Sequence, residues 1–240
     1  MGNIKLIVYA FLSNVRHMMP RNIQDIFNDW FFLYLPIWLI RRLTIEYDGY
    51  FKYYQPKKGD TVFDCGAWIG HFTLMASRLV GKNGMVYSFE PQEEIYNMLK
   101  KRIKERNIKN VIPINSAVYS HKSTMSVEKE TSSADFTIVD IKNGKLSNPV
   151  TIDMVDLDSF IKEFKITRLN FIKMDIEGAE IEALQGAKNV LKNFSPKIAI
   201  ASYHMREGTQ SAKWLEHFLQ EQGYKTWTGF PSHLTTYGYK

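Results

Sequence analysis

The sequence predicts an α/β protein built on a mostly parallel sheet with helices on both faces. From Asp60 onward, short apolar segments with strand character alternate with segments of helical periodicity, an alternation typical of parallel sheets. The last two predicted strands, Tyr224–Gly229 and Leu234–Tyr239, are separated only by Phe230–His233. Because so short a link cannot cross a sheet, we expect the chain to end in an antiparallel hairpin.

The first predicted strand, Thr61–Cys65, runs into a glycine turn and then a helix from about Ile69 to Val80. We expect Gly66 to let the backbone turn sharply and approach a ligand, because a Cβ there would clash. Gly70 is expected to keep the start of the helix close to the strand. A strand, a glycine turn and a helix are how open α/β sheets hold the adenosine part of a cofactor.

The second predicted strand, Met85–Phe89, ends in an acid, Glu90. An acid at this place can accept hydrogen bonds from two ribose hydroxyls. Dinucleotide sites favour G-x-G-x-x-G, whose middle glycine makes room for a pyrophosphate. Here Ala67 and Trp68 fill that space. The spacing therefore favours a cofactor without a phosphate, S-adenosylmethionine, over a nicotinamide dinucleotide.

The remaining elements largely continue the alternation. An amphipathic helix between Pro91 and Arg106 is followed by a third strand, Val111–Asn115. Residues 119–152 interrupt the pattern and predict a small β insertion, with short strands at Thr124–Glu128, Phe136–Val139 and Val150–Ile152. Later helices are expected at Leu157–Phe164, Ala179–Leu191 and Ser211–Glu221. Between them, strands are expected at Leu169–Met174 and Lys197–Ala201.

Residues 1–50 are interpreted as a helical, aromatic-rich extension in front of a main domain at residues 51–240. The apolar run Trp30–Ile40 is too short to span a bilayer, which needs roughly 20 apolar residues. Two interpretations stay open. The helices pack on the sheet or form a dimer face, or the aromatic and basic segment 30–42 makes peripheral contact with a membrane.

Composition narrows the class of protein further. The net charge of +6 is modest and is ascribed to a solvated basic helix face, and no interleaving of basic and aromatic residues indicates nucleic-acid binding. Cys65 is the single cysteine, so no disulfide can form within the chain. This cysteine usage predicts a reducing, cytoplasmic compartment.

Polar residues follow the predicted strands at the sheet edge where ligands of open parallel sheets sit. Ser116 and Ala117, after the third strand, are expected to meet the adenine edge. His71 is expected to face solvent or the adjacent loop. The full set of expected cofactor-binding residues is Asp64, Gly66, Ala67, Gly70, Glu90, Ser116 and Ala117.

Two residues are expected to act on the acceptor. Asp175 follows the fourth strand of the main sheet and could orient the acceptor, act as a base or help to hold a metal. His204 follows the fifth strand and is the natural base, because histidine titrates near neutral pH. A divalent metal is not favoured, since the hard ligands lack a clear third carboxylate. Further candidates for substrate contact are Glu177, Tyr203 and His233.

Three segments resemble the FkbM-type methyltransferases. Gly59–Gly70 contains D-x-G-A-x-x-G, Val86–Pro91 contains the strand-end acid, and Phe171–Glu180 contains D-x-E-G-A-E. The resemblance extends from about Tyr53 to the C-terminus. It implies a three-layer, Rossmann-like class I methyltransferase fold and S-adenosylmethionine as methyl donor. It also implies O-methylation of a hydroxyl on a small-molecule or glycan acceptor, such as a sugar, glycolipid or natural product.

Two alternatives remain beside this interpretation. One is an NAD(P)-dependent oxidoreductase, which the bulky Ala67–Trp68 pair and the closing hairpin disfavour. The other is a non-catalytic, cofactor-binding module that associates with membranes through the aromatic segment. The sequence leaves the acceptor and a homo-oligomeric state open.

Overall fold

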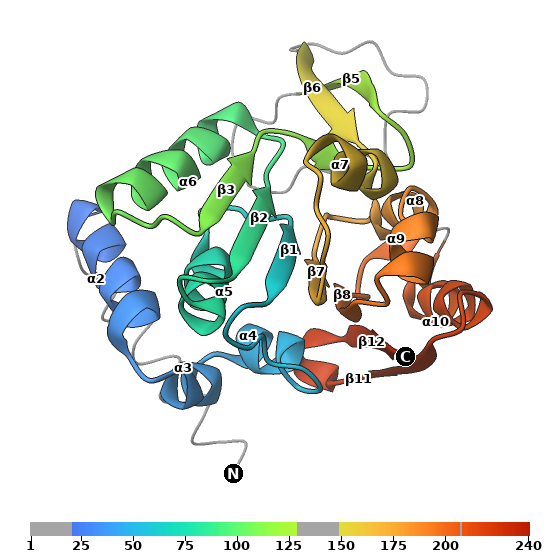
Figure 1. Cartoon of the computed structure of the whole chain (residues 1–240), viewed down its shortest axis with the longest axis horizontal. Helices are drawn as coiled ribbons and strands as arrows, with labels where there is room; N and C mark the ends of the chain where they lie inside the picture. The colour runs from blue at the N-terminus through green and yellow to red at the C-terminus, as the bar shows by residue number, and fades with distance from the viewer. Residues whose placement is uncertain (1–20, 129–148, 207) are drawn as a thin grey trace.

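A seven-stranded sheet forms the centre of the computed structural model, which describes residues 21–128, 149–206 and 208–240 (Figure 1). The strands lie in the order β11-β12-β8-β7-β1-β2-β3. Their bounds, in that order, are Lys225–Gly229, Thr235–Tyr239, Lys197–Ala201, Phe171–Met174, Thr61–Cys65, Met85–Phe89 and Val111–Ile114. β1, β2, β3, β7 and β8 pair in parallel, which confirms the predicted α/β fold.

The predicted closing hairpin is confirmed. β12 pairs antiparallel with β11 on one side and with β8 on the other, so the last strand lies inside the sheet. The link between the two strands is a short 3₁₀ helix, Pro231–His233. This arrangement brings the link residues to the same edge of the sheet as the end of β8.

Helices cover both faces of the sheet in two separate cores (Figure 1). Successive strand residues point to opposite faces, so Val62 packs in one core while Phe63 and Cys65 pack in the other. The first core contains residues of α2, α3, α4, α5 and α6, at Arg21–Tyr34, Ile37–Leu43, Ile45–Tyr50, His71–Val80 and Glu93–Glu105. The second contains residues of α7, α8, α9 and α10, at Leu157–Glu163, Glu180–Gln185, Lys188–Asn193 and Ala212–Glu221.

The single helix predicted at Ala179–Leu191 is wrong, because the structure has two helices there, α8 and α9. Gly186 lies at the break. A Cβ on Gly186 would collide with the carbonyl oxygen of Tyr119, so the chain passes close to the β insertion at this point. A close tertiary contact therefore lies at the helix break, and periodicity alone does not reveal it.

The β insertion is a separate three-stranded sheet in the order β4-β6-β5. Its strands are Ala117–Val118, Pro149–Val155 and Ser123–Glu128. β6 extends past the predicted end at Ile152, and Asp156 then caps α7 by accepting the Ser159 N–H at 2.7 Å. A further short pair, β9 and β10, at Met205–Arg206 and Thr209–Gln210, was not predicted. The strand predicted at Phe136–Val139 lies outside the described residues.

The described part of the N-terminal extension packs on the domain. Phe31, Phe32 and Ile40 are buried in the first core, and Arg78 of α5 donates hydrogen bonds to the carbonyl oxygens of Phe32 and Leu35 at 2.6 and 2.8 Å. The predicted packing is therefore present, while the boundary between residues 50 and 51 stays a prediction.

Other aromatic side chains of the extension face outward. Trp30, Tyr34 and Trp38 are 49%, 68% and 65% exposed. In the described part of the chain, no helix is both long and apolar enough to cross a membrane.

Candidate active site

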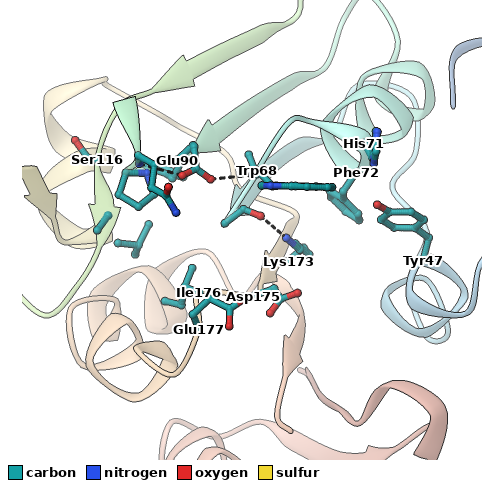
Figure 2. Close-up of a pocket in the computed structure, with 17 residues that line it drawn as sticks. Tyr47, Trp68, His71, Phe72, Glu90, Ser116, Lys173, Asp175, Ile176 and Glu177 are labelled. Atoms are coloured by element: carbon teal, nitrogen blue, oxygen red, sulfur yellow. Dashed lines mark hydrogen bonds between the residues drawn. The ribbon is translucent and has the colours of Figure 1, made fainter. Parts of the chain in front are cut away.

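A cavity of about 290 Å³ opens at the carboxyl ends of β1, β2 and β7. Its lining residues come from the segments that follow these strands and from the start of the β insertion. Gly66, Ala67, Glu90, Ser116, Ala117, Asp175 and Glu177 line it, as do Trp68 and Lys173. In Figure 2, Glu90 and Ser116 lie at one end of the cavity, and Phe72 and Tyr47 lie at the other.

Glu90 is held at the cavity wall by the backbone. Its Oε2 accepts the N–H of Trp68 at 2.9 Å, and its Oε1 accepts the N–H of Gln92 at 3.0 Å (Figure 2). The side chain is only 5% exposed. Burial raises the pKa of Glu90 from 4.5 to about 7, against the lowering effect of the two N–H donors. Each oxygen keeps a further lone pair that could accept a hydroxyl.

Two of the expected cofactor residues support the site without lining it. A Cβ on Gly70 would collide with Leu99 of α6, so this glycine permits close packing. Asp64 is fully buried and accepts the hydroxyl of Thr73 at 2.6 Å. Burial raises the pKa of Asp64, and Lys173 and Thr73 oppose that rise.

The glycine turn is constrained by the protein itself. Gly66 has a φ of +78°, and a Cβ there would collide with the carbonyl oxygen of Asp175 at the end of β7. Room for a ligand, the expected reason for a glycine at position 66, is therefore only part of the explanation. The turn must also fit against the neighbouring strand, and this fit joins the two sides of the cavity.

Lys173, on β7, contacts residues at the end of β1 on the other side of the cavity. Its ammonium donates to the carbonyl oxygen of Gly66 at 2.7 Å and lies 3.2 Å from Asp64 Oδ1. The side chain is 4% exposed and lies over the rings of Tyr50 and Phe72, at 5.4 and 5.8 Å from their centroids. Sequence reasoning missed this residue, although an ionisable side chain inside the apolar strand Phe171–Met174 was a usable signal.

Asp175 is the centre of the acceptor side of the site. It accepts the hydroxyl of Tyr50 at 2.8 Å on Oδ2 and the hydroxyl of Tyr203 at 3.1 Å on Oδ1. The ring of His233 lies 4.9 Å from the Tyr50 ring and 5.1 Å from the Tyr203 ring, centroid to centroid. The structure therefore brings Asp175, Tyr203 and His233 together. Tyr50 was missed because nothing in its local sequence marks it.

His204 lies among carboxylates. Its Nδ1 is 3.0 Å from Glu180 Oε1, and its Nε2 is 3.3 Å from Glu177 Oε2 and 3.7 Å from Asp175 Oδ1. Burial lowers the pKa of His204, but these neighbouring carboxylates outweigh burial and raise that pKa from 6.5 to about 10. At neutral pH, His204 in this environment holds a proton. Glu180, which sequence reasoning missed, is the last acid of the D-x-E-G-A-E motif.

His233 differs from His204 in its surroundings. Its Nε2 lies 3.4 Å from the Tyr50 hydroxyl, and its Nδ1 lies 3.2 Å from Thr235 Oγ1. Burial lowers the pKa of His233, so its ring is neutral at neutral pH. The pKa values of His204 and His233 are therefore shifted in opposite directions, although both rings lie beside Tyr203.

The expectation that His71 faces solvent is wrong. His71 is 6% exposed and stacks on Phe32, with ring centroids 4.4 Å apart. It also lines the cavity. The reason is tertiary, because α2 covers the start of α5 and removes His71 from water.

The fold and the site define a class of protein. A mostly parallel seven-stranded sheet with an antiparallel last strand inserted beside β8, and a cavity at the strand ends, is the class I methyltransferase fold. The chain belongs to the FkbM methyltransferase family, because residues 64–226 match the family described as the methyltransferase FkbM domain.

Individual relatives agree with this assignment. The chain is 27% identical over 158 residues to hexuronic acid methyltransferase AglP of Haloferax volcanii, across 65% of this chain and 62% of that protein. The structure resembles methyltransferase FkbM from Methylobacillus flagellatus, with a TM-score of 0.56 at 18% identity, across 98% of this chain and 58% of that one. The chain thus spans less than two thirds of either relative.

A more distant likeness concerns the fold alone. Fibrillarin of Aeropyrum pernix, solved with natively bound S-adenosyl-L-methionine, superposes with a TM-score of 0.50 at 13% identity, across 82% of this chain and 74% of that one. The two chains thus share a fold.

Proposed function

We propose that this protein transfers the methyl group of S-adenosylmethionine to a hydroxyl group of a sugar, glycolipid or natural product. The observation that carries the proposal is the buried Glu90 carboxylate, fixed by the N–H groups of Trp68 and Gln92 at the wall of the cavity. It would accept the two ribose hydroxyls. Ser116 and Ala117 would meet adenine, and Gly66 and Ala67 would lie beside the methionine part.

The chemistry requires an in-line displacement. The acceptor hydroxyl oxygen forms a bond to the methyl carbon while the bond from carbon to sulfur breaks. The electron pair of that bond stays on sulfur, which gives S-adenosylhomocysteine, and the hydroxyl proton leaves to a base. Much of the rate enhancement in such a reaction comes from positioning. Asp175 is the carboxylate proposed to orient the hydroxyl and receive its proton, because it borders the cavity and is held by Tyr50 and Tyr203.

A sugar is the favoured class of acceptor. The support is the 27% identity to a hexuronic acid methyltransferase. Glu177, Tyr203 and His233 surround Asp175 and supply polar and aromatic groups of the kind that bind carbohydrate hydroxyls. In this proposal they contact the acceptor.

The cofactor is tested by calorimetric titration with S-adenosylmethionine and, separately, S-adenosylhomocysteine. We expect binding by the wild-type protein and by Glu93→Ala, which removes an exposed acid from the start of α6. The Glu90→Ala variant should bind neither compound. Retention of a nicotinamide nucleotide without binding of either sulfur compound would favour an oxidoreductase instead. Turnover is then measured on a panel of sugar, lipid and phenol acceptors.

The exposed aromatic face of the extension favours peripheral membrane contact as a second property. Trp30, Tyr34 and Trp38 expose amphipathic rings, and Arg42 is exposed beside them on α3. We expect sedimentation with anionic vesicles that Trp38→Ala weakens and Trp227→Ala, an exposed tryptophan on β11, does not. Equal sedimentation of both variants would remove this proposal and leave the methyl transfer untouched.

A further inference from the structure

A group of ionisable side chains lies behind the cofactor cavity, between the ends of β7 and β8. Asp175, Glu180 and His204 each present one atom that could bind a metal ion, and these atoms lie within 4.8 Å of one another. Glu177 adds a third carboxylate, with its Oε2 3.3 Å from His204 Nε2. With Asp175 and Glu177 predicted from the sequence, Glu180 is the further carboxylate that only the fold brings into the group.

Glu180 has a carboxylate oxygen whose hydrogen-bonding capacity is not used by any described residue. Its side chain is 0% exposed, and its Oε1 is near the N–H groups of Ile176 and Gly178, at 3.1 and 3.3 Å. Its Oε2 is buried and has no hydrogen-bond partner among the residues that the structure describes. A buried carboxylate oxygen without a partner is strongly unfavourable, so its persistence indicates a missing cation or donor.

In the part of the chain that the structure describes, the ring nitrogens of His204 also lack well-placed hydrogen-bond partners. Both ring nitrogens are buried and approach carboxylate oxygens at 3.0 to 3.7 Å, yet within the described residues neither makes a well-directed hydrogen bond. Each nitrogen points at negative charge in a crowded space. An ion between the ring and the carboxylates would bind one ring nitrogen, and the other nitrogen could donate its N–H to a neighbouring carboxylate oxygen.

The charge balance of the group is also negative. Three carboxylates surround one imidazole, and the nearby Lys173 is already engaged with Asp64 and the Gly66 carbonyl. The sulfonium of a bound cofactor could approach Asp175 and Glu177, which line the cavity, but Glu180 does not line it. A proton on His204 offsets only one of the three carboxylate charges, and a metal ion bound to the imidazole would replace that proton with a larger positive charge.

We propose that Asp175, Glu180 and His204 bind a divalent first-row transition-metal ion such as Mn²⁺ or Zn²⁺. One imidazole nitrogen with two carboxylates suits such ions, whereas Mg²⁺ and Ca²⁺ prefer ligand sets made only of oxygen. The surroundings fit a metal site, since Tyr50 and Tyr203 orient Asp175 and two backbone N–H groups orient Glu180.

The role of the ion rests on the proposed function. Asp175 joins the metal group to the cofactor cavity, so an acceptor hydroxyl that reaches Asp175 also reaches the ion. A metal-bound hydroxyl loses its proton more readily. The ion would therefore make the acceptor oxygen a better nucleophile at neutral pH. With Asp175 bound to the ion, Glu177 would take the proton in its place.

The test uses the tag-free full chain, freed of metal with a chelator and titrated with Co²⁺ while visible absorption is recorded. We expect one ion per chain, with absorption bands of a nitrogen and oxygen ligand set, and competition by Mn²⁺ and Zn²⁺ but not by Mg²⁺. Glu180→Gln should weaken binding about tenfold or more. Glu182→Gln is the matched control, because Glu182 lies on the same helix outside the group.

A second variant protects the test against misfolding. His204→Gln removes the imidazole and should abolish the bands, and thermal unfolding of both variants reports whether they fold. No Co²⁺ bands in the wild-type protein, or unchanged binding in folded Glu180→Gln and His204→Gln, would overturn the inference. S-adenosylmethionine binding is measured on the same metal-free protein. S-adenosylmethionine binding without metal binding would reject only the proposed ion. Metal binding without S-adenosylmethionine binding would reject only the proposed methyl transfer.

Discussion

The two sides of the active site are built in different ways. On the cofactor side, Gly66, Glu90 and Ser116 each lie just after a parallel strand, and backbone N–H groups fix the Glu90 carboxylate. On the acceptor side, Asp175 is held by the side chains of Tyr50 and Tyr203, and Tyr50 is 125 residues away in the chain. Local backbone geometry thus defines one side, and long-range side-chain contacts define the other.

This difference predicts that the two sides can be damaged separately. Backbone donors stay in place when a distant side chain changes, so cofactor binding should survive changes on the acceptor side. Lys173 is the exception, because it contacts both Asp64 and the Gly66 carbonyl from β7.

The largest effect is expected for Asp175→Asn. Loss of the carboxylate should lower turnover by about 10²- to 10⁴-fold, the usual contribution of a general base. The dissociation constant for S-adenosylmethionine should stay within about threefold of the wild-type value, because the Glu90 donors are unchanged. Asp153→Asn, an exposed acid on β6, serves as control. Equal loss of cofactor binding would show that the two sides are not separable.

The second effect concerns stability. Lys173→Met leaves Asp64, which is 0% exposed, without its cationic partner. Breaking a buried ion pair from one side costs about 3–5 kcal/mol in free energy of unfolding, which urea denaturation measures. Adding Asp64→Asn to Lys173→Met should restore part of this loss, since no buried charge remains. A single variant as stable as wild type would mean that Lys173 does not join the two sides.

The third effect is a pH dependence of cofactor affinity. Since the pKa of Glu90 is raised to about 7, the ionised form that accepts ribose hydroxyls is lost as the pH falls below 7. The affinity should therefore fall by up to about tenfold per pH unit below that point. Calorimetry from pH 5.5 to 8.5 measures it, and Glu90→Gln should give a weaker and flatter profile.

The raised pKa of Glu90 also determines how the folding stability of the protein without cofactor changes with pH. The folded state holds the Glu90 proton more tightly than the unfolded chain, whose pKa is near 4.5. The contribution of Glu90 to stability is therefore greatest at low pH and declines as the pH rises from about 4.5 to 7. Bound cofactor should offset this decline. An affinity that is constant down to pH 5.5 would contradict the role of Glu90.

The smallest effect is expected for Tyr203→Phe. It removes a hydrogen bond to Asp175 from a side chain that is 37% exposed, so water can replace the hydroxyl. Turnover should fall by about two- to tenfold, the equivalent of about 0.5–1.5 kcal/mol. Tyr239→Phe, another exposed tyrosine on β12, should have no effect. A loss as large as that of Asp175→Asn would give Tyr203 a more direct part in the reaction.

Much of the fold could be predicted because it follows from local patterns. The strand Thr61–Cys65, the turn at Gly66 and the acid at Glu90 lie close together in sequence, and parallel pairing of β1 with β2 follows from their connection. The short link Phe230–His233 likewise left only an antiparallel pair. In these cases chain length and backbone conformation leave few alternatives.

The errors occur where distant elements meet. The helix break at Gly186 lies at a close contact with Tyr119, and the burial of His71 follows from the packing of Phe32. No periodicity within either helix encodes a neighbour supplied by another segment. The same reason explains why Tyr50 was not predicted beside Asp175.

The family, the order of the elements and the residues at the strand ends could be predicted from the sequence, because a motif and a period of two or 3.6 residues are local properties. The burial of Glu180 beside His204, the hydrogen bond from Tyr50 to Asp175 and the contact of Lys173 with Asp64 depend on the folded chain. Burial and charge pairing arise between segments that the chain brings together, so their energies appear only in the folded protein.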